Sequence, residues 1–126
     1  MSTATQSHTD TAKLDRELNQ AVLAGDILGA FDKYYADDLV MQENDAEPIL
    51  GKAANRKREE EFVNSVEQFH GAKLLGEAVN GDVSYSEWSY DVSFKGAGRV
   101  KMEQVAARRW KNGKVSHERF YYKASY

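Results

Sequence analysis

The sequence predicts an α+β domain in which three N-terminal helices pack in the concavity of a strongly curved, mostly antiparallel sheet. Three helix-like segments come first, and three long strand-like segments at 83–95, 99–110 and 115–123 follow with no further helix. Tight turns at 96–98 and 112–113 join these strands, as in an antiparallel meander. A curved sheet wrapped around helices encloses an interior, which is where a small domain commonly holds a ligand.

Length, charge and cysteine content narrow the class of protein. The 126 residues suit one domain, expected over 10–126, after a Ser/Thr-rich segment at 1–9 that is expected to be a flexible tail. That segment has no apolar run, so neither a signal peptide nor a membrane span is expected, and the protein is expected to be cytoplasmic. The net charge of −3 argues against a nucleic-acid partner. No cysteine is present, which excludes disulfides and thiolate chemistry.

The first two helices are delimited by capping residues. Asp10 or Thr11 can cap the first helix, which carries apolar residues at helical spacing. Gly25 ends this helix and Asp26 caps the next one, a stop-and-start pair. The second helix is expected to continue to about 37–38.

A short strand at 39–43 leads through a polar loop to a third helix at about 52–68. The apolar stripe of this helix is predicted to consist of Ala54, Phe62, Val66 and Phe69. Arg58 lies in the middle of the stripe and either extends to solvent or faces a ligand. The charged run 56–61 is expected to form a solvated face with i,i+3 and i,i+4 ion pairs. A further strand is expected from about 72 to a turn at 80–81.

The long strands alternate between two faces, and two of them have both faces partly apolar or aromatic. One face would meet the helices. The other is then too apolar for water alone, so a homodimer through the outer sheet face is expected. Which face of 99–110 lines the interior is left open by its weaker alternation.

Short local motifs follow one another in a fixed order at 24–26, 35–41, 47–51, 109–115 and 118–122. Their order and spacing resemble the nuclear transport factor 2-like superfamily. The last two, Arg-Trp-Lys-Asn-Gly-Lys-Val and Glu-Arg-Phe-Tyr-Tyr, are similar to the SnoaL-like and ketosteroid-isomerase-like branches. The resemblance implies a cone-shaped α+β barrel around a pocket, usually a homodimer packed through the sheet. It also implies a range of isomerases, cyclases, dehydratases, epoxide hydrolases and non-catalytic binders, so fold alone leaves function open.

The ketosteroid-isomerase residues transfer only in part. The position of the general base matches Glu43, although Glu47 could point inward instead. The oxyanion-binding tyrosine matches Leu18, and the protonated aspartate matches Ala106 or Ala107. Because both oxyanion donors are missing, and removing even one such donor costs about 3 kcal/mol, classical ketosteroid isomerisation is not expected. The SnoaL-type aspartate is also unmatched.

A set of candidate site residues follows from the strand register and the resemblance. Glu43, Glu118 and Arg108 are the candidate catalytic residues: a glutamate would abstract a proton next to a carbonyl, and Arg108 or Tyr90 would stabilise the oxyanion. The alternative is a cross-strand Arg108–Glu118 pair and a solvated Glu43. The candidate ligand-binding residues are Tyr35, Met41, Arg58, Phe62, Trp88, Tyr90, Gln104, Phe120 and Tyr122.

Three functions remain open. The first is a small-molecule-binding domain with a mostly apolar pocket. The second is an isomerase, cyclase or dehydratase that uses a pocket carboxylate, and the third is a protein-interaction module. No cofactor is expected, because no glycine-rich nucleotide loop precedes a helix. No metal site is expected either, since no two histidines have ligand spacing on one element.

Overall fold

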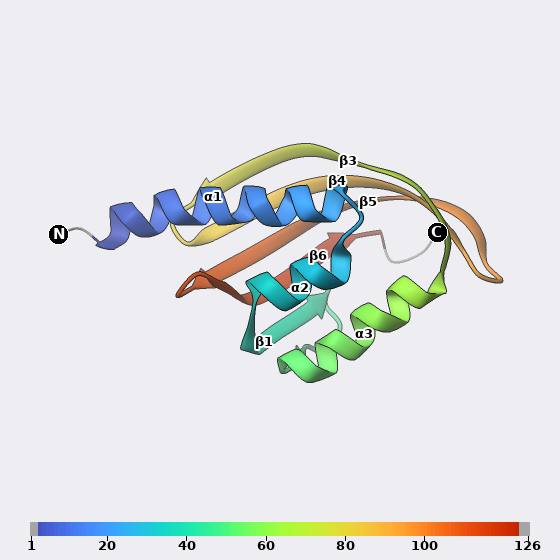
Figure 1. The fold of residues 1–126 in the computed structure, drawn as a ribbon, viewed down its shortest axis with the longest axis horizontal. Coiled ribbons are helices and arrows are strands. Elements are labelled where there is room, and N and C mark those ends of the chain that lie inside the picture. Colours follow the sequence, from blue (N-terminus) through green and yellow to red (C-terminus); the bar gives the residue numbers. More distant parts are fainter. Residues whose placement is uncertain (1–2, 124–126) are drawn as a thin grey trace.

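The computed structural model describes residues 3–123 and confirms the α+β class, with three helices and a six-stranded sheet. The helices come first in the chain except for one strand pair, as Figure 1 shows. The elements are α1 (Thr3–Leu23), α2 (Ile27–Tyr34), β1 (Tyr35–Glu43), β2 (Ile49–Leu50), α3 (Lys52–Ser65), β3 (Val66–Asn80), β4 (Val83–Phe94), β5 (Gly98–Lys111) and β6 (Lys114–Tyr122).

The sheet has the strand order β2-β1-β6-β5-β4-β3 and is curled without closing into a barrel. All neighbouring strands are antiparallel except β1 and β6, which are parallel. The long strands β3, β4 and β5 bend over the helices (Figure 1). Helix α1 packs along β3 and β4, and α3 packs on β1, so the helices fill the concave side.

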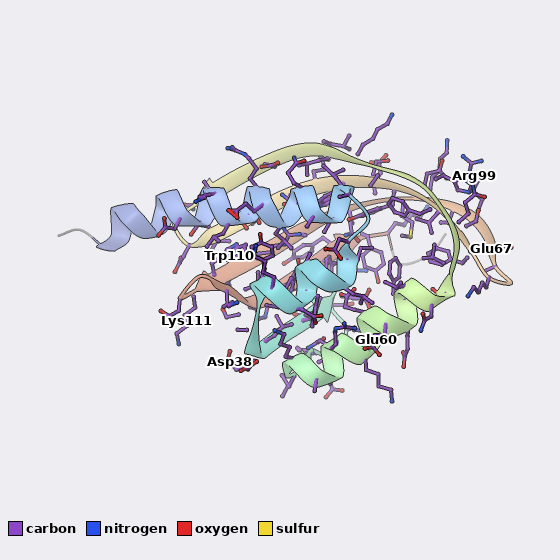
Figure 2. The ribbon with its side chains drawn as sticks, viewed as in Figure 1. Asp38, Glu60, Glu67, Arg99, Trp110 and Lys111 are labelled. Carbon is purple, nitrogen blue, oxygen red and sulfur yellow. The ribbon has the colours of Figure 1, made fainter. Side chains whose placement is uncertain are left out.

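The hydrophobic core lies where α1 and α2 meet β1 and the ends of β5 and β6. Its buried members are Leu18, Ala30, Phe31, Tyr34, Tyr35, Leu39, Met41, Trp110 and Val115. Figure 2 shows Trp110 beneath α1, whereas the charged side chains of Glu60, Arg99 and Lys111 lie at the periphery. Burial of these apolar side chains is the main stabilising contribution to a domain of this size.

The capping chemistry between the first two helices is as predicted. Gly25 has a φ of +85°, a left-handed conformation that glycine adopts without steric cost. The Asp26 side chain accepts a hydrogen bond from the Gly29 backbone N–H at 3.1 Å and caps α2. Helix α1 begins before the predicted caps at Asp10 or Thr11, since the backbone is helical from Thr3. The flexible tail over 1–9 stays a prediction, and residues 1–2 lie outside the described residues.

Two predicted helix ends are wrong, for the same physical reason. Helix α2 ends at Tyr34 instead of 37–38, because Tyr35 is extended and begins the pairing of β1 with β6 opposite Val115. Helix α3 ends at Ser65 instead of Gln68, because β3 begins at Val66, opposite Phe94. In both places, pairing with a distant strand overrides the local helical pattern.

Among residues 3–123, no helix is long and apolar enough to cross a membrane.

Candidate functional site

A cavity of about 310 Å³ lies between the concave sheet face and the three helices. Most of its wall is apolar, with phenylalanines from α2, α3, β3, β4 and β6. The polar lining residues are Tyr35, Glu43, Asn55, Arg58, Glu59, Tyr90, Gln104, Arg108, Glu118 and Tyr122. This volume is at the lower end of the range in which proteins enclose small organic molecules.

Every candidate site residue predicted from the sequence lines this cavity except Trp88. The sequence did not decide which face of β5 lines the interior. Gln104 and Arg108 lie in the cavity wall, so it is the face that carries these two residues. Trp88 shares a face of β4 with Tyr90 and stacks on its ring at 5.5 Å, but it is a core residue, 1% exposed, outside the cavity wall. Helix α1 covers that part of the sheet, since Asn19 bonds to Ser86, two residues before Trp88.

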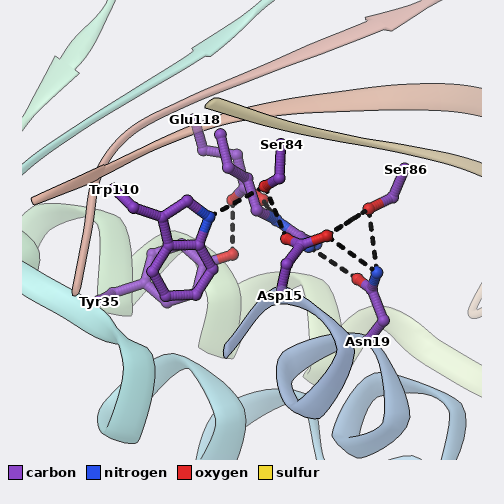
Figure 3. Close-up of polar contacts among 8 residues, drawn as sticks. Asp15, Asn19, Tyr35, Ser84, Ser86, Trp110 and Glu118 are labelled. Carbon is purple, nitrogen blue, oxygen red and sulfur yellow. Dashed lines mark hydrogen bonds and ion pairs between the residues drawn. The ribbon is translucent and has the colours of Figure 1, made fainter. Parts of the chain in front are cut away.

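The deep end of the cavity is held by a buried polar network centred on Arg108 (Figure 3). The Arg108 guanidinium donates through Nε to Glu118 Oε2 at 2.7 Å and through Nη1 to Asp15 Oδ1 at 2.8 Å and Asn19 Oδ1 at 2.7 Å. The Tyr35 hydroxyl donates to Glu118 Oε1 at 2.7 Å. Both oxygens of the Glu118 carboxylate are therefore engaged.

Serines of β4 connect the network to α1 and to the core. Ser84 donates to Asp15 Oδ1 at 2.7 Å and accepts from Trp110 Nε1 at 2.9 Å, while Ser86 accepts from Asn19 Nδ2 at 3.0 Å. These contacts join α1 to the sheet through polar groups that are nearly all excluded from solvent. Breaking one member would leave several buried partners unsatisfied.

Burial and neighbouring charges fix the protonation states of Arg108 and Tyr35. Burial opposes the charged form of Arg108, but the negative charges of Glu118 and Asp15 and the hydrogen bond to Glu118 outweigh it and raise the pKa of Arg108. Burial, followed by the charge of Glu118, raises the pKa of Tyr35 well above its usual value. Arg108 is thus a fixed cation and Tyr35 a neutral hydrogen-bond donor.

The pairing of Arg108 and Glu118 is the cross-strand arrangement that the sequence offered as the alternative to catalysis. The two residues are direct partners in the β5–β6 register and are 3% and 0% exposed. A general base needs a lone pair that can reach the substrate proton. With Tyr35 and Arg108 bound to its two oxygens, Glu118 is better suited to positioning than to accepting a proton.

Glu43 lies at the mouth of the cavity and is also paired. Its carboxylate accepts from Arg58 Nη2 at 2.5 Å and from the Tyr122 hydroxyl at 3.1 Å. The Glu43 and Arg58 side chains are 39% and 43% exposed, so the ion pair is partly solvated and contributes at most about 1 kcal/mol. Arg58 therefore lines the cavity and extends to solvent at once.

Glu59 is the cavity carboxylate that the sequence analysis missed. It lies on α3 in the middle of the charged run 56–61, yet its side chain is partly buried and lines the cavity. Burial, then the charge of Glu118 and a smaller contribution from Glu43, raise its pKa to about 7, although the positive charges of Arg58 and Arg56 act in the opposite direction. The missed signal was the helical spacing of Asn55, Glu59 and Phe62, which places the glutamate on the face of a predicted pocket residue.

Asn55 lies one turn before Glu59 and is 1% exposed. Ala54, predicted in the apolar stripe, is exposed instead, because the helix is rotated so that the row through Asn55 faces inward. The Asn55 Nδ2 group donates to the carbonyl oxygens of Ile49 at 2.9 Å and Gly51 at 2.8 Å, and holds the loop before α3.

Among residues 3–123, no group of three or more histidine, aspartate or glutamate side chains is arranged to hold a metal ion. The site chemistry described above is that of carboxylates, guanidiniums and tyrosines.

The model of the SnoaL-like domain family matches residues 19–122. The chain belongs to the SnoaL-like family. Its fold agrees with that of a candidate SnoaL-like polyketide cyclase from Mesorhizobium loti, at 34% identity, with a TM-score of 0.78 over 88% of this chain and 97% of that one. No match was found among curated proteins.

Two more distant structures share the fold of this SnoaL-like domain. An LEH-like epoxide hydrolase from M. tuberculosis has 18% identity and a TM-score of 0.74 over 92% of this chain and 84% of that one. A ketosteroid isomerase-like protein from Catenulispora acidiphila, solved with trimethylamine, has 16% identity and a TM-score of 0.70 over 83% and 82%. At these identities the likeness concerns the fold alone.

The SnoaL-like domain has apolar side chains where the resemblance places the ketosteroid-isomerase oxyanion donors. Leu18 is 1% exposed and lines the cavity, and Ala106 is fully buried on the same face of β5 as Arg108. Neither side chain can donate a hydrogen bond. The hydrogen-bond donors that line the cavity of this domain include Tyr35, Tyr90 and Arg108 instead.

Proposed function

We propose that this SnoaL-like domain binds a small, mostly apolar molecule that carries one polar group. The observation that supports this is the cavity of about 310 Å³, with apolar walls and a limited set of polar side chains. Such a cavity buries most of a small ligand and orients it through a few polar contacts. The buried network around Arg108 links the wall residues Tyr35, Arg108 and Glu118 to one another.

Titration of ¹⁵N-labelled protein with 2-phenylethanol tests this proposal. Saturable amide shift changes confined to cavity residues are expected. In the variant M102W an indole replaces a wall side chain of β5 and fills the cavity, so those shifts should be lost. E103Q, at the neighbouring exposed position of β5, is the matched control. Unsaturable or scattered shifts, or unchanged binding by M102W, would rule out the cavity as the binding site.

A second candidate function is a cofactor-independent isomerase, cyclase or dehydratase. The observation that favours it is Glu59, a carboxylate with a pKa of about 7 in a largely apolar cavity, which suits a general acid or base at neutral pH. The sequence-predicted bases Glu43 and Glu118 are both engaged in ion pairs, so Glu59 takes their place in this proposal. The Tyr90 hydroxyl, which also lines the cavity, would stabilise the oxyanion.

Deuterium exchange tests the enzymatic candidate without knowledge of the substrate. Small ketones such as cyclohexanone are incubated in D₂O with the protein, and exchange next to the carbonyl is followed by NMR. Faster exchange that is lost in E59Q and kept in E43Q would support proton abstraction by Glu59. Exchange at the buffer rate over a panel of ketones would speak against this activity.

The homodimer through the outer sheet face stays a prediction. That face exposes Tyr85 and Tyr121, which are 42% and 45% exposed and flank β5 on neighbouring strands. We propose that a second copy covers them. Sedimentation should show a dimer that Y85E weakens. A monomer at high concentration would contradict the dimer, and the exposed surface would then favour the alternative of a protein-interaction module.

A further inference from the structure

Two hydrogen-bond acceptors on one face of α3 belong to residues that line the cavity and lack a donor among the described residues. The first is Asn55 Oδ1, which has no hydrogen-bond partner among the described residues. Its orientation is fixed, because Nδ2 donates to two backbone carbonyls, Ile49 O and Gly51 O, and a flipped amide would set oxygen against oxygen. The Asn55 side chain is 1% exposed, so solvent does not satisfy this oxygen.

The second acceptor is the Glu59 carboxylate, one turn further along the same face. Among residues 3–123 it forms neither a hydrogen bond nor an ion pair, unlike the other two cavity carboxylates. Glu43 is bound by Arg58 and Tyr122, and Glu118 by Arg108 and Tyr35. A partly buried carboxylate without a donor is destabilising, and a ligand that donates a hydrogen bond to it would remove this cost.

The charges of the cavity wall indicate the sign of that partner. The wall contains three carboxylates, on Glu43, Glu59 and Glu118, and two guanidiniums, on Arg58 and Arg108. Arg108 also binds Asp15, which takes up part of its charge. An ionised Glu59 is thus left without a compensating cation. Aromatic rings form much of the remaining wall and attract a cation through their faces.

We propose that the Asn55–Glu59 face of α3 binds the protonated amine of a ligand whose apolar body fills the rest of the cavity. The proposal rests on the proposed binding function and adds the chemistry of the polar group. An ammonium presents up to three donors, more than one acceptor can use, and supplies the positive charge that the wall lacks. A neutral hydroxyl offers one donor and no charge, and a carboxylate would add a further negative charge.

Binding of an amine through Glu59 depends on the ionisation of this carboxyl group. Because burial raises the pKa of Glu59 to about 7, the affinity for an amine that stays protonated should fall below pH 7. The titratable or charged side chains around Glu59 come from four strands and from α3 itself. They are Tyr35 and Glu43 on β1, Tyr90 on β4, Arg108 on β5, Glu118 and Tyr122 on β6, and Arg56 and Arg58 on α3.

Three ligands with one apolar body test the proposal: 2-phenylethylamine, 2-phenylethanol and 3-phenylpropionate. At pH 8 the amine should bind about 10- to 100-fold more tightly than the alcohol, the range expected for a charge-assisted hydrogen bond. Calorimetry on wild type, E59Q and E61Q measures this preference. E59Q should lose it, and E61Q should keep it, because Glu61 is an exposed carboxylate on the same helix. In wild type the preference should fall about tenfold for each pH unit below 7.

The outcomes separate this inference from the function on which it rests. Equal binding of amine and alcohol, tighter binding of 3-phenylpropionate, or a preference retained in E59Q would overturn the amine site and leave the binding cavity standing. Failure of all three ligands to bind would overturn both. Amide shifts in α3 on titration with the amine, absent in E59Q, would locate the ammonium group on the proposed face.

Discussion

Replacement of Glu59 by glutamine should stabilise the protein above neutral pH. The pKa of Glu59 is about 7 in the folded protein and 4.5 in an unperturbed chain, so the folded state binds more protons between these values. Stability therefore falls as pH rises through this window, and the loss is complete above pH 7. A difference of about 2.5 pKa units at 1.36 kcal/mol each gives a loss of roughly 3 kcal/mol. E59Q has no carboxyl group to titrate and should avoid this loss.

Urea unfolding of wild type, E59Q and E61Q at intervals from pH 4.5 to 8 measures the effect. The stability of E59Q relative to wild type should rise by roughly 3 kcal/mol between pH 5 and 8. E61Q removes one negative charge from the exposed face of the same helix and controls for net charge. A constant difference between E59Q and wild type over the whole range would refute the burial of an unpaired carboxyl group at this position.

Two further variants test the packing around the site. R108M should lower the free energy of unfolding by about 3–5 kcal/mol, because it leaves the buried carboxylates of Asp15 and Glu118 without their cation. The free energy of unfolding of R109M, at the neighbouring exposed position, should stay within about 0.5 kcal/mol of wild type. Equal losses in R108M and R109M would show that the buried network does not contribute to stability. D26A should cost about 1 kcal/mol in urea unfolding, since it removes the N-cap of α2, and an unchanged midpoint would show the cap to be dispensable.

The parts of the fold that local chemistry determines were predictable. The Gly25-Asp26 boundary is one example, because a left-handed glycine and a capping carboxylate act within a few residues. The ends of α2 and α3 were not, because Tyr35 and Val66 are extended by pairing with strands far along the chain. Where a helical pattern of apolar residues continues into a strand, the local sequence does not show that pairing with a distant strand will end the helix.

The site residues also fall into those that the sequence predicted and those that it did not. Period-two alternation placed Gln104, Arg108 and Glu118 on one face, and all three line the cavity. Helix α3 is polar on more than one side, so its charged run concealed the inward row through Asn55 and Glu59. The contacts of α1 with β4 could not be predicted, because they depend on how the helix lies across the sheet.

The three cavity carboxylates differ in what they contribute because they differ in their partners. Glu118 is bound on both oxygens and is part of the structure that joins β1, β5 and β6. Glu43 is bound at the partly solvated mouth, where its ion pair can open without leaving a buried charge. Glu59 has no protein partner among the described residues, and its ionisation costs stability. Because ionised Glu59 destabilises the folded chain, a ligand that pairs with this carboxylate would remove that cost. The free energy gained in this way would contribute to binding of the ligand.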